Sequence, residues 1–213
     1  MKQIFGAALL GAALISGSAN AAVVGVSGQM EILATPTSVT NLSPFDNDAM
    51  QIFNEVQNLV LGSALTLRDA SGGPDEIIAA GTRISSHMIF LNRTTTGVAL
   101  VRTGMATFDG IVLGLITSSA RLDATDALLG AIGTTYQLSK TRGFGNRGLE
   151  GKEGAFALSN GGETLALTLR VTQPGDWIRV VTLSAVPVPA AGFLLIGALG
   201  GLAALRRRKA VAA

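Results

Sequence analysis

Near its C-terminus the chain carries an uninterrupted apolar run that is followed at once by four basic residues. Ala190–Leu205 contains only Ala, Gly, Phe, Leu and Ile. As a helix it would span roughly 24 Å. That is somewhat less than the roughly 30 Å hydrocarbon core, and Val186–Pro189 and snorkelling arginine side chains can cover the difference. We therefore expect one transmembrane helix, with a basic membrane stop on its cytoplasmic side and the preceding chain outside. The stop consists of Arg206, Arg207, Arg208 and Lys209.

The residues just before this run make the interpretation more specific. They read Val186, Pro187, Val188, Pro189 and Ala190. A short proline motif, one apolar span and a terminal arginine cluster together resemble the PEP-CTERM sorting signal, here in a Val-Pro-x-Pro-Ala form with valine in the usual glutamate position. The resemblance implies a Gram-negative bacterium, an inner-membrane intermediate, processing by an exosortase-type enzyme, and delivery to the cell surface or the extracellular matrix.

The N-terminus has the pattern of a secretory signal peptide. Lys2 precedes an apolar stretch, Ile4–Ile15, and small residues follow, with Ala19 and Ala21 in the positions of an A-x-A cleavage site. We expect cleavage between Ala21 and Ala22, which makes residues 1–21 the signal peptide. The apolar stretch is short for a retained membrane anchor.

Removing both ends changes the charge of what remains. Lys2 and the four tail cations supply five of the 16 Lys and Arg residues, which leaves 11 against 14 Asp and Glu residues in residues 22–185. A net charge of about three negative units without a basic cluster argues against nucleic-acid binding. The chain has no cysteine, so this exported domain of 164 residues has to be held together by packing and pairing instead of disulfides.

The middle region has the pattern of an all-β domain. Short apolar or alternating runs are separated by turn residues, which is typical of an antiparallel β-sandwich or jelly roll. The clearest alternation is Thr164–Thr172, which we expect to form a hairpin with Phe156–Ser159 around Asn160-Gly161-Gly162. The other expected strands are Met30–Leu33, Ile84–Leu91, Val98–Arg102, Thr103–Phe108, Ile111–Thr117 and Trp177–Leu183.

Three local patterns concern single segments of the middle region. Gln51–Leu61 fits a helical face slightly better than a strand, but Phe53–Asn58 resembles a run found in β-rich PEP-CTERM ectodomains, and we interpret the segment as a strand. Asp109-Gly110 predicts a hairpin turn, followed by Ile111–Ile116 as a central strand buried on both faces. One short helix, Asp123–Leu129, is expected, with Asp123 as its N-cap and Gly130 as its stop.

Several features that suggest chemistry have simpler explanations. Gly143–Gly148 matches G-x-G-x-x-G, but no βαβ unit surrounds it, and Gly143–Gly154 fits an exposed loop better than a nucleotide site. His87 is the single histidine, so a histidine metal site or a conventional triad lacks partners; it fits a polar group on a half-buried strand. We therefore assign no catalytic, cofactor or metal residues and expect no enzyme.

Two ligand classes stay open. Calcium takes several oxygen ligands from acidic loops, and the chain has three acidic pairs, although capping and solvated turns explain them better. The pairs are Asp46 with Asp48, Asp75 with Glu76, and Asp123 with Asp126. Matrix polysaccharide is the other class, although Trp177 and Tyr136 alone are few for a sugar-stacking platform.

The expected function follows from the signals and the β-rich middle. We expect an exported surface or matrix protein with a non-enzymatic structural or interaction role. A carbohydrate-binding module for matrix exopolysaccharide is the alternative. A secreted hydrolase that uses carboxylates is a third hypothesis, because distance along the sequence does not tell which acids meet in space.

Overall fold

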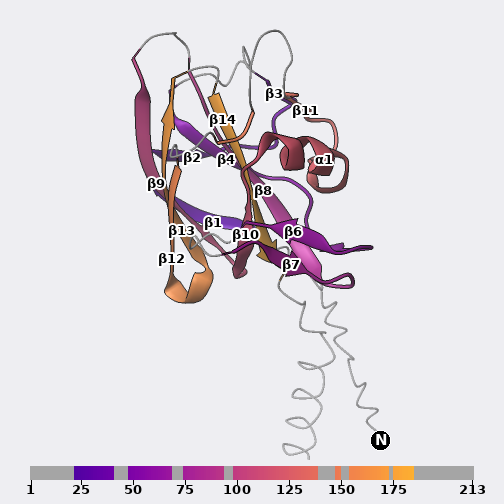
Figure 1. Cartoon of the computed structure of the whole chain (residues 1–213). Helices are drawn as coiled ribbons and strands as arrows, with labels where there is room; N and C mark the ends of the chain where they lie inside the picture. The colour runs from indigo at the N-terminus through magenta and orange to yellow at the C-terminus, as the bar shows by residue number, and fades with distance from the viewer. Residues whose placement is uncertain are drawn as a thin grey trace, which may run out of the picture. The chain divides into compact units, whose positions relative to one another are not determined.

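The computed structural model describes residues 22–40, 48–68, 74–93, 98–138, 147–149, 154–172 and 175–184, which all lie in one compact unit, Asn20–Ala185. These residues are mostly β-strand with one short helix (Figure 1), which confirms the all-β expectation. Ala22 is described, but the rest of the expected cleavage site, the sorting motif and the basic membrane stop lie outside the described residues. Within those residues, no helix has the length and apolar character that crossing a membrane requires.

One sheet has four antiparallel strands in the order β1, β9, β13, β12. Its strands are β1 Val23–Gly28, β9 Leu100–Phe108, β12 Gly154–Ser159 and β13 Thr164–Val171. The predicted hairpin of β12 and β13 is confirmed. Its turn is the short 3-10 segment η1 Asn160–Gly162, in which Asn160, Gly161 and Gly162 all have positive φ, a conformation that glycine adopts without strain.

The second sheet runs β10, β14, β8, β4, β2, and β5 also pairs with β8. Its strands are β2 Met30–Ile32, β4 Met50–Asn54, β5 Leu59–Val60, β8 Arg83–Asn92, β10 Val112–Ile116 and β14 Gly175–Leu183. The pairing of β2 with β4 is parallel, so the sheet is not purely antiparallel as expected. Two small pairs complete the fold: β3 Ser38–Val39 with β11 Thr135–Tyr136, in parallel, and β6 Leu65–Leu67 with β7 Glu76–Ile78.

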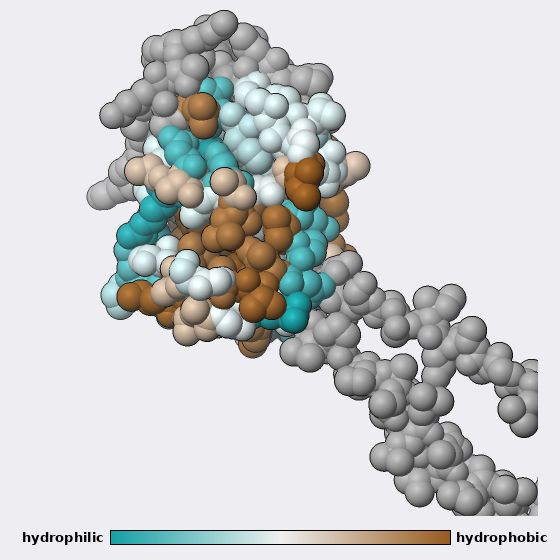
Figure 2. Space-filling model, turned by 90° about the vertical axis from the view of Figure 1, so that its right-hand side faces the viewer, coloured by the Kyte–Doolittle hydropathy of each residue, from teal (hydrophilic) through white to brown (hydrophobic). Residues whose placement is uncertain are grey.

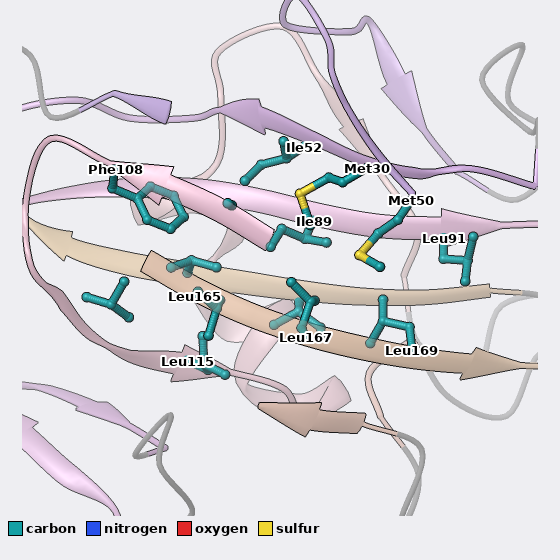
Figure 3. Packing of buried hydrophobic residues seen from close by; sticks show 14 of the residues in the cluster. Met30, Met50, Ile52, Ile89, Leu91, Phe108, Leu115, Leu165, Leu167 and Leu169 are labelled. Atoms are coloured by element: carbon teal, nitrogen blue, oxygen red, sulfur yellow. The ribbon is translucent and has the colours of Figure 1, made fainter. Parts of the chain in front are cut away.

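The two sheets face one another across the main core. Figure 3 shows the side chains that both sheets send into this space, with Leu165, Leu167 and Leu169 from β13 opposite Ile89 and Leu91 from β8. The alternation along β13 places every second residue here, and these leucines are at most 2% exposed. The alternating pattern in the sequence thus fixes which face of β13 is buried.

The six-stranded sheet is covered on its other face as well. A second apolar cluster, which includes Phe53, Phe90 and Trp177 from the sheet, packs against Leu122 and Leu129 of the helix α1 Ser119–Leu129. Because both faces are covered, nine of the ten residues of β8 are buried. This explains why β8 does not alternate between apolar and polar residues in the sequence.

Two local expectations are wrong, and two others are only partly correct. Asp109 and Gly110 do not close a hairpin: β9 and β10 belong to different sheets, so the chain crosses from one sheet to the other at this point. β10 is an edge strand and not a central one; Arg68 bonds to Leu115 from its outer side, which buries much of it. Gln51–Leu61 forms strands and not a helix, as expected, but it contains two of them, β4 and β5, because the chain leaves the β4 path after Asn54 and Asn58 has a positive φ of 58°.

The fourth correction concerns the helix. It begins at Ser119, four residues before the expected start, and its N-cap is Ser118, whose side chain makes no capping hydrogen bond. Asp123 therefore lies inside the helix, and Asp123 and Asp126 lie three residues apart on one face. Gly130 ends the helix as expected, with its N–H donating to the Asp126 carbonyl at 2.9 Å.

Figure 2 views the side of the molecule that carries α1, β6 and β7, and apolar surface gathers there below the helix. Exposed apolar side chains on β5 and β7 include Val60, 48% exposed, and Ile77, 70% exposed. β6 and β7 form a two-stranded sheet, in which Thr66, Glu76 and Ile77 are exposed.

Candidate functional site: a buried arginine network

Two arginines and three carboxylates meet beneath helix α1. We call this set the arginine network; it consists of Glu55, Asp123, Asp126, Arg147 and Arg179. The members come from four separate parts of the chain: the loop after β4, helix α1, the segment 147–149, and strand β14. The side chains of both arginines and of Glu55 are fully buried.

Arg179 and Glu55 form the centre of the network. The Arg179 Nε and Nη2 atoms donate to the two Glu55 carboxylate oxygens at 2.7 and 2.8 Å, a bidentate arrangement. Glu55 also accepts hydrogen bonds from Ser86 Oγ at 2.6 Å and from the Tyr136 hydroxyl at 2.7 Å. Both carboxylate oxygens are therefore satisfied twice, which offsets the loss of hydration on burial.

Asp126 connects the two arginines. Its Oδ1 accepts from Arg179 Nη2 at 3.0 Å and from Arg147 Nη2 at 2.9 Å, and its Oδ2 accepts from Arg147 Nη1 at 2.5 Å. Asp123, one turn earlier on the same helix, accepts from Arg147 Nη1 at 3.3 Å. Thr125 Oγ1 lies 2.8 Å from Arg179 Nη1. One face of the helix is thereby tied to β14 and to the segment at Arg147.

Tyr136 closes the network from the side of β11. Its ring centroid lies 5.2 Å from the guanidinium carbon of Arg147 and 5.6 Å from that of Arg179, which is the range of a cation–π contact. Its hydroxyl accepts the Ala131 N–H at 2.7 Å and donates to Glu55. Burial, together with the negative charge of Glu55, raises the pKa of Tyr136 above its ordinary value, so the hydroxyl keeps its proton.

The charges in the network favour the ionised state of Arg179. Burial by itself lowers the pKa of this guanidinium, but the neighbouring carboxylates Glu55 and Asp126 outweigh that effect, and the pKa lies above its ordinary value. Arg179 therefore stays charged, and the Glu55 and Asp126 carboxylates hold its guanidinium in place. Such an arrangement is suited to fastening elements together and not to exchanging protons.

Arg147 is brought into the network by its backbone. The N–H groups of Arg147 and Gly148 both donate to Ser119 Oγ, at 3.0 and 3.1 Å, and Leu149 N–H donates to the Thr117 carbonyl at 2.8 Å. A Cβ at Gly148 would lie only 2.0 Å from the Thr117 carbonyl oxygen, so glycine is required for this close approach. Arg147 and Gly148 are buried, which contradicts the expectation of an exposed loop at these two positions; residues 143–146 and 150–153 of that loop lie outside the described residues.

His87 is part of a second buried polar group. Nδ1 lies 2.8 Å from Asn54 Oδ1 and Nε2 lies 3.1 Å from Thr182 Oγ1, and the ring leans on Phe108 with centroids 4.8 Å apart. Burial lowers the pKa of His87 to about 3, so the ring is neutral at ordinary pH. The residue is fully buried on a strand with both faces covered, and not half-buried as expected.

Two of the acidic pairs that were considered for calcium contain residues that form ion pairs with arginines. Asp123 and Asp126 face arginines, and Asp75 pairs with Arg121 at 2.5 Å, a hydrogen bond that lowers the pKa of Asp75. Asp46 lies outside the described residues. Among the described residues, no three His, Asp or Glu side chains form a group that could hold a metal ion.

Trp177 does not serve as a sugar platform. It is fully buried in the second apolar cluster, and its indole N–H donates to the Val39 carbonyl at 2.8 Å. The sequence analysis also missed the network residues Glu55, Arg147 and Arg179. A signal was present for one of them: a lone arginine within the otherwise apolar strand Trp177–Leu183 indicates a buried charge with a partner.

The outer face of the four-stranded sheet is partly exposed to solvent. Threonines form cross-strand pairs on it, with Thr103 Oγ1 2.9 Å from Thr168 Oγ1 and Thr107 Oγ1 3.2 Å from Thr164 Oγ1. Beside the first pair lies a shallow depression of about 180 Å³. It is lined by Thr103, Ala155, Phe156, Ala157, Ala166, Leu167 and Thr168. We call this surface the threonine face.

Comparison with known proteins gave no match to a family model, to a curated protein or to a solved structure.

Proposed function

We propose that the chain is an exported surface or matrix protein with a non-enzymatic structural or interaction role, processed by an exosortase-type enzyme at its C-terminal signal. The observation that carries the proposal is the arrangement of the arginine network. Its charges are satisfied by one another and join the helix, the Arg147 segment and β14 in a chain without cysteine. A buried ion-pair network that joins separate elements suits a domain that has to stay folded outside the cell without disulfides.

The terminal sequences supply the route in this proposal. Ala19, Ala21 and Ala22 mark signal-peptide cleavage, Val186–Ala190 marks the sorting motif, and Arg206–Lys209 marks the membrane stop. Between the two signals lies a β-rich unit of the sandwich type, in which two sheets share a core. The partners that follow from this are the processing enzyme and, before processing, the membrane.

The proposal is tested by comparing cells that carry the intact gene with cells that lack it. We expect the protein in the surface or matrix fraction, and we expect its loss to change biofilm cohesion. A complemented strain that expresses Arg179→Met is compared with the strain that expresses the unchanged protein. This variant keeps the targeting signals and breaks only the arginine network, so it separates the effect of the network from that of the signals. Recovery of the protein only from the inner membrane or cytoplasm, with cohesion unchanged on deletion, would overturn the proposal.

A second candidate function is supported by the threonine face. Cross-strand hydroxyl pairs beside a shallow, partly apolar depression offer donors and acceptors to a matrix exopolysaccharide, and they do not require Trp177. The test is Thr103→Val together with Thr168→Val, which keeps the side-chain shape and removes both hydroxyls. Thr66→Val, an exposed threonine on β6, is the control. We expect binding to matrix polysaccharide to fall at least fivefold in the double variant only; equal binding in all three proteins would remove this candidate.

A further inference from the structure

Strand β12 forms an open edge of the four-stranded sheet. It pairs with β13 on one side, and no strand in the described part of the chain pairs with its other side. An edge strand presents unpaired N–H and C=O groups, and proteins usually protect such edges with charged residues, proline or a bulge. β12 reads Gly-Ala-Phe-Ala-Leu-Ser, with an unbroken register against β13, and it has none of these protections.

Two other end strands, β1 and β10, differ from β12. After β1 the chain turns at Gln29 into β2 of the other sheet, and on β1 the Val23 N–H donates to Asn54 Oδ1 of β4 at 3.1 Å. At β10, the N–H and C=O of Arg68 bond to Leu115 at 2.8 Å each. In Figure 1, β12 lies at the outer side of its sheet, beside β13.

The larger apolar side chains of β12 are also partly exposed to solvent. Phe156 and Leu158 point toward the core between the sheets, but both remain partly exposed, whereas Leu165 and Leu167 on the neighbouring β13 are buried. One further strand at this edge would cover Phe156 and Leu158 and would satisfy the outward backbone groups. The missing element is therefore an extended strand with apolar residues on one face.

We propose that this strand is β12 of a second copy of the chain, which pairs antiparallel across a two-fold axis at Ala157. In this register each Phe156 lies opposite the second copy's Leu158 on the core face, and each Ala155 lies opposite the second copy's Ser159 on the outer face. The segment is thus complementary to itself, as an interface between identical subunits requires. The described unit is net negative, but no charges meet here, because β12 has none.

The dimer would have a continuous sheet of eight strands, twice the four of one copy, with the two threonine faces joined into one surface. Aromatic and aliphatic pairs directly opposite each other across two strands stabilise a sheet by roughly 0.2–1 kcal/mol each. The backbone hydrogen bonds of the new strand pair add to this. The pairing of β12 between two copies does not depend on export. If the pairing test fails, the proposed function is unaffected.

A disulfide test is direct, because the chain has no cysteine of its own. In the full chain with Ala157→Cys, the two cysteines would lie opposite each other, with Cα atoms about 4.5–5.5 Å apart, a separation that a disulfide spans. Ala166→Cys is the matched control. Ala166 is the direct partner of Ala157 on β13, on the same face, but two copies of it would be separated by three strand spacings, about 14 Å.

After mild oxidation, we expect Ala157→Cys to run as a dimer on a non-reducing gel and to return to a monomer on reduction, while Ala166→Cys stays monomeric. Monomer for Ala157→Cys, or equal dimer for both variants, would overturn the proposal. Both side chains are on the outer face, so neither cysteine enters the core, and circular dichroism checks that each variant keeps its strands.

Sedimentation of the chain without cysteine gives an independent measurement. Ala157→Lys would place two like charges about 5 Å apart at the axis, and we expect at least a tenfold weaker dimer. Ala166→Lys adds the same charge about 14 Å from its counterpart, beyond the roughly 8 Å screening length at physiological salt, and we expect little change. Equal dimerisation of both lysine variants would contradict the register.

Discussion

Arg179, in the middle of β14, grips Glu55 through two hydrogen bonds of 2.7 and 2.8 Å, and neither side chain reaches solvent. The two residues are 124 positions apart in the sequence. Through Asp126 and Arg147 the same contact extends to helix α1 and to the segment 147–149. This pair joins the loop after β4 to β14 across β8, the strand that lies between β4 and β14.

Breaking this pair from one side should destabilise the protein strongly. Glu55→Gln or Arg179→Met leaves a buried charge without its partner, and we expect a loss of about 3–5 kcal/mol in the free energy of unfolding. Urea unfolding measures this loss. Arg121→Met is the control, because the Arg121–Asp75 pair is 41% and 46% exposed and is screened by solvent, so its loss should change the free energy of unfolding little.

The double variant is the sharper test of the pair. Because Glu55→Gln combined with Arg179→Met leaves no unpaired charge between the two positions, we expect the combined loss to be smaller than the sum of the two single losses by at least about 1 kcal/mol. Strict additivity would mean that the two side chains act independently, in contradiction of the bidentate geometry.

His87 should make stability depend on pH. In the folded protein its pKa is about 3, whereas in the unfolded chain it is about 6.5. Between these values the unfolded state binds one more proton than the folded state. The stability from neutral His87 is therefore complete above pH 6.5 and is lost as the pH falls toward 3. The loss amounts to roughly 2 kcal/mol between pH 6.5 and 5.

The measurement is the free energy of unfolding at several pH values for the wild type and for His87→Gln, which cannot titrate. The variant should be less stable at pH 7, and its stability should fall less steeply than that of the wild type as the pH is lowered from 6.5 to 5. Parallel pH profiles for the two proteins would assign the slope to other groups.

Gly148 should not tolerate a side chain. A Cβ there would meet the backbone oxygen of Thr117 at 2.0 Å, and a backbone atom cannot rotate away. We expect Gly148→Ala to cost about 3 kcal/mol and to loosen Arg147 from Asp126. At Gly62 a Cβ would have no atom within 4 Å, so Gly62→Ala should change the melting temperature little. Similar melting temperatures for both variants would contradict the docking of the 147–149 segment.

The sequence predicted the fold class and several strands, and the reason differs from strand to strand. β13 alternates leucine with threonine, alanine and arginine because only one of its faces is buried, so its period of two could be recognised. β8 and β14 are buried on both faces and do not alternate. Only the turns that flank them in the sequence indicate where these two strands begin and end. The position of β10 at an edge depends on Arg68, a contact between distant residues that no local pattern contains.

The arginine network could not be predicted from local sequence patterns either, because it too consists of contacts between distant residues. Asp123 and Asp126 were recognised as a pair at the start of a helix, but their partners lie 21 to 53 residues away from Asp126. Capping and ion pairing give the same signal in the sequence, an acid near a helix start. Only the three-dimensional position of Arg147 and Arg179 distinguishes them.

The most direct measurement of the proposed role is the intact mass of the protein recovered from cells and from the medium, with and without the candidate sortase. We expect a sortase-dependent species that begins at Ala22 and ends near Pro187–Ala190, with or without an added group. An unprocessed C-terminal run in both strains would contradict the proposal and would leave a single-pass membrane protein in its place.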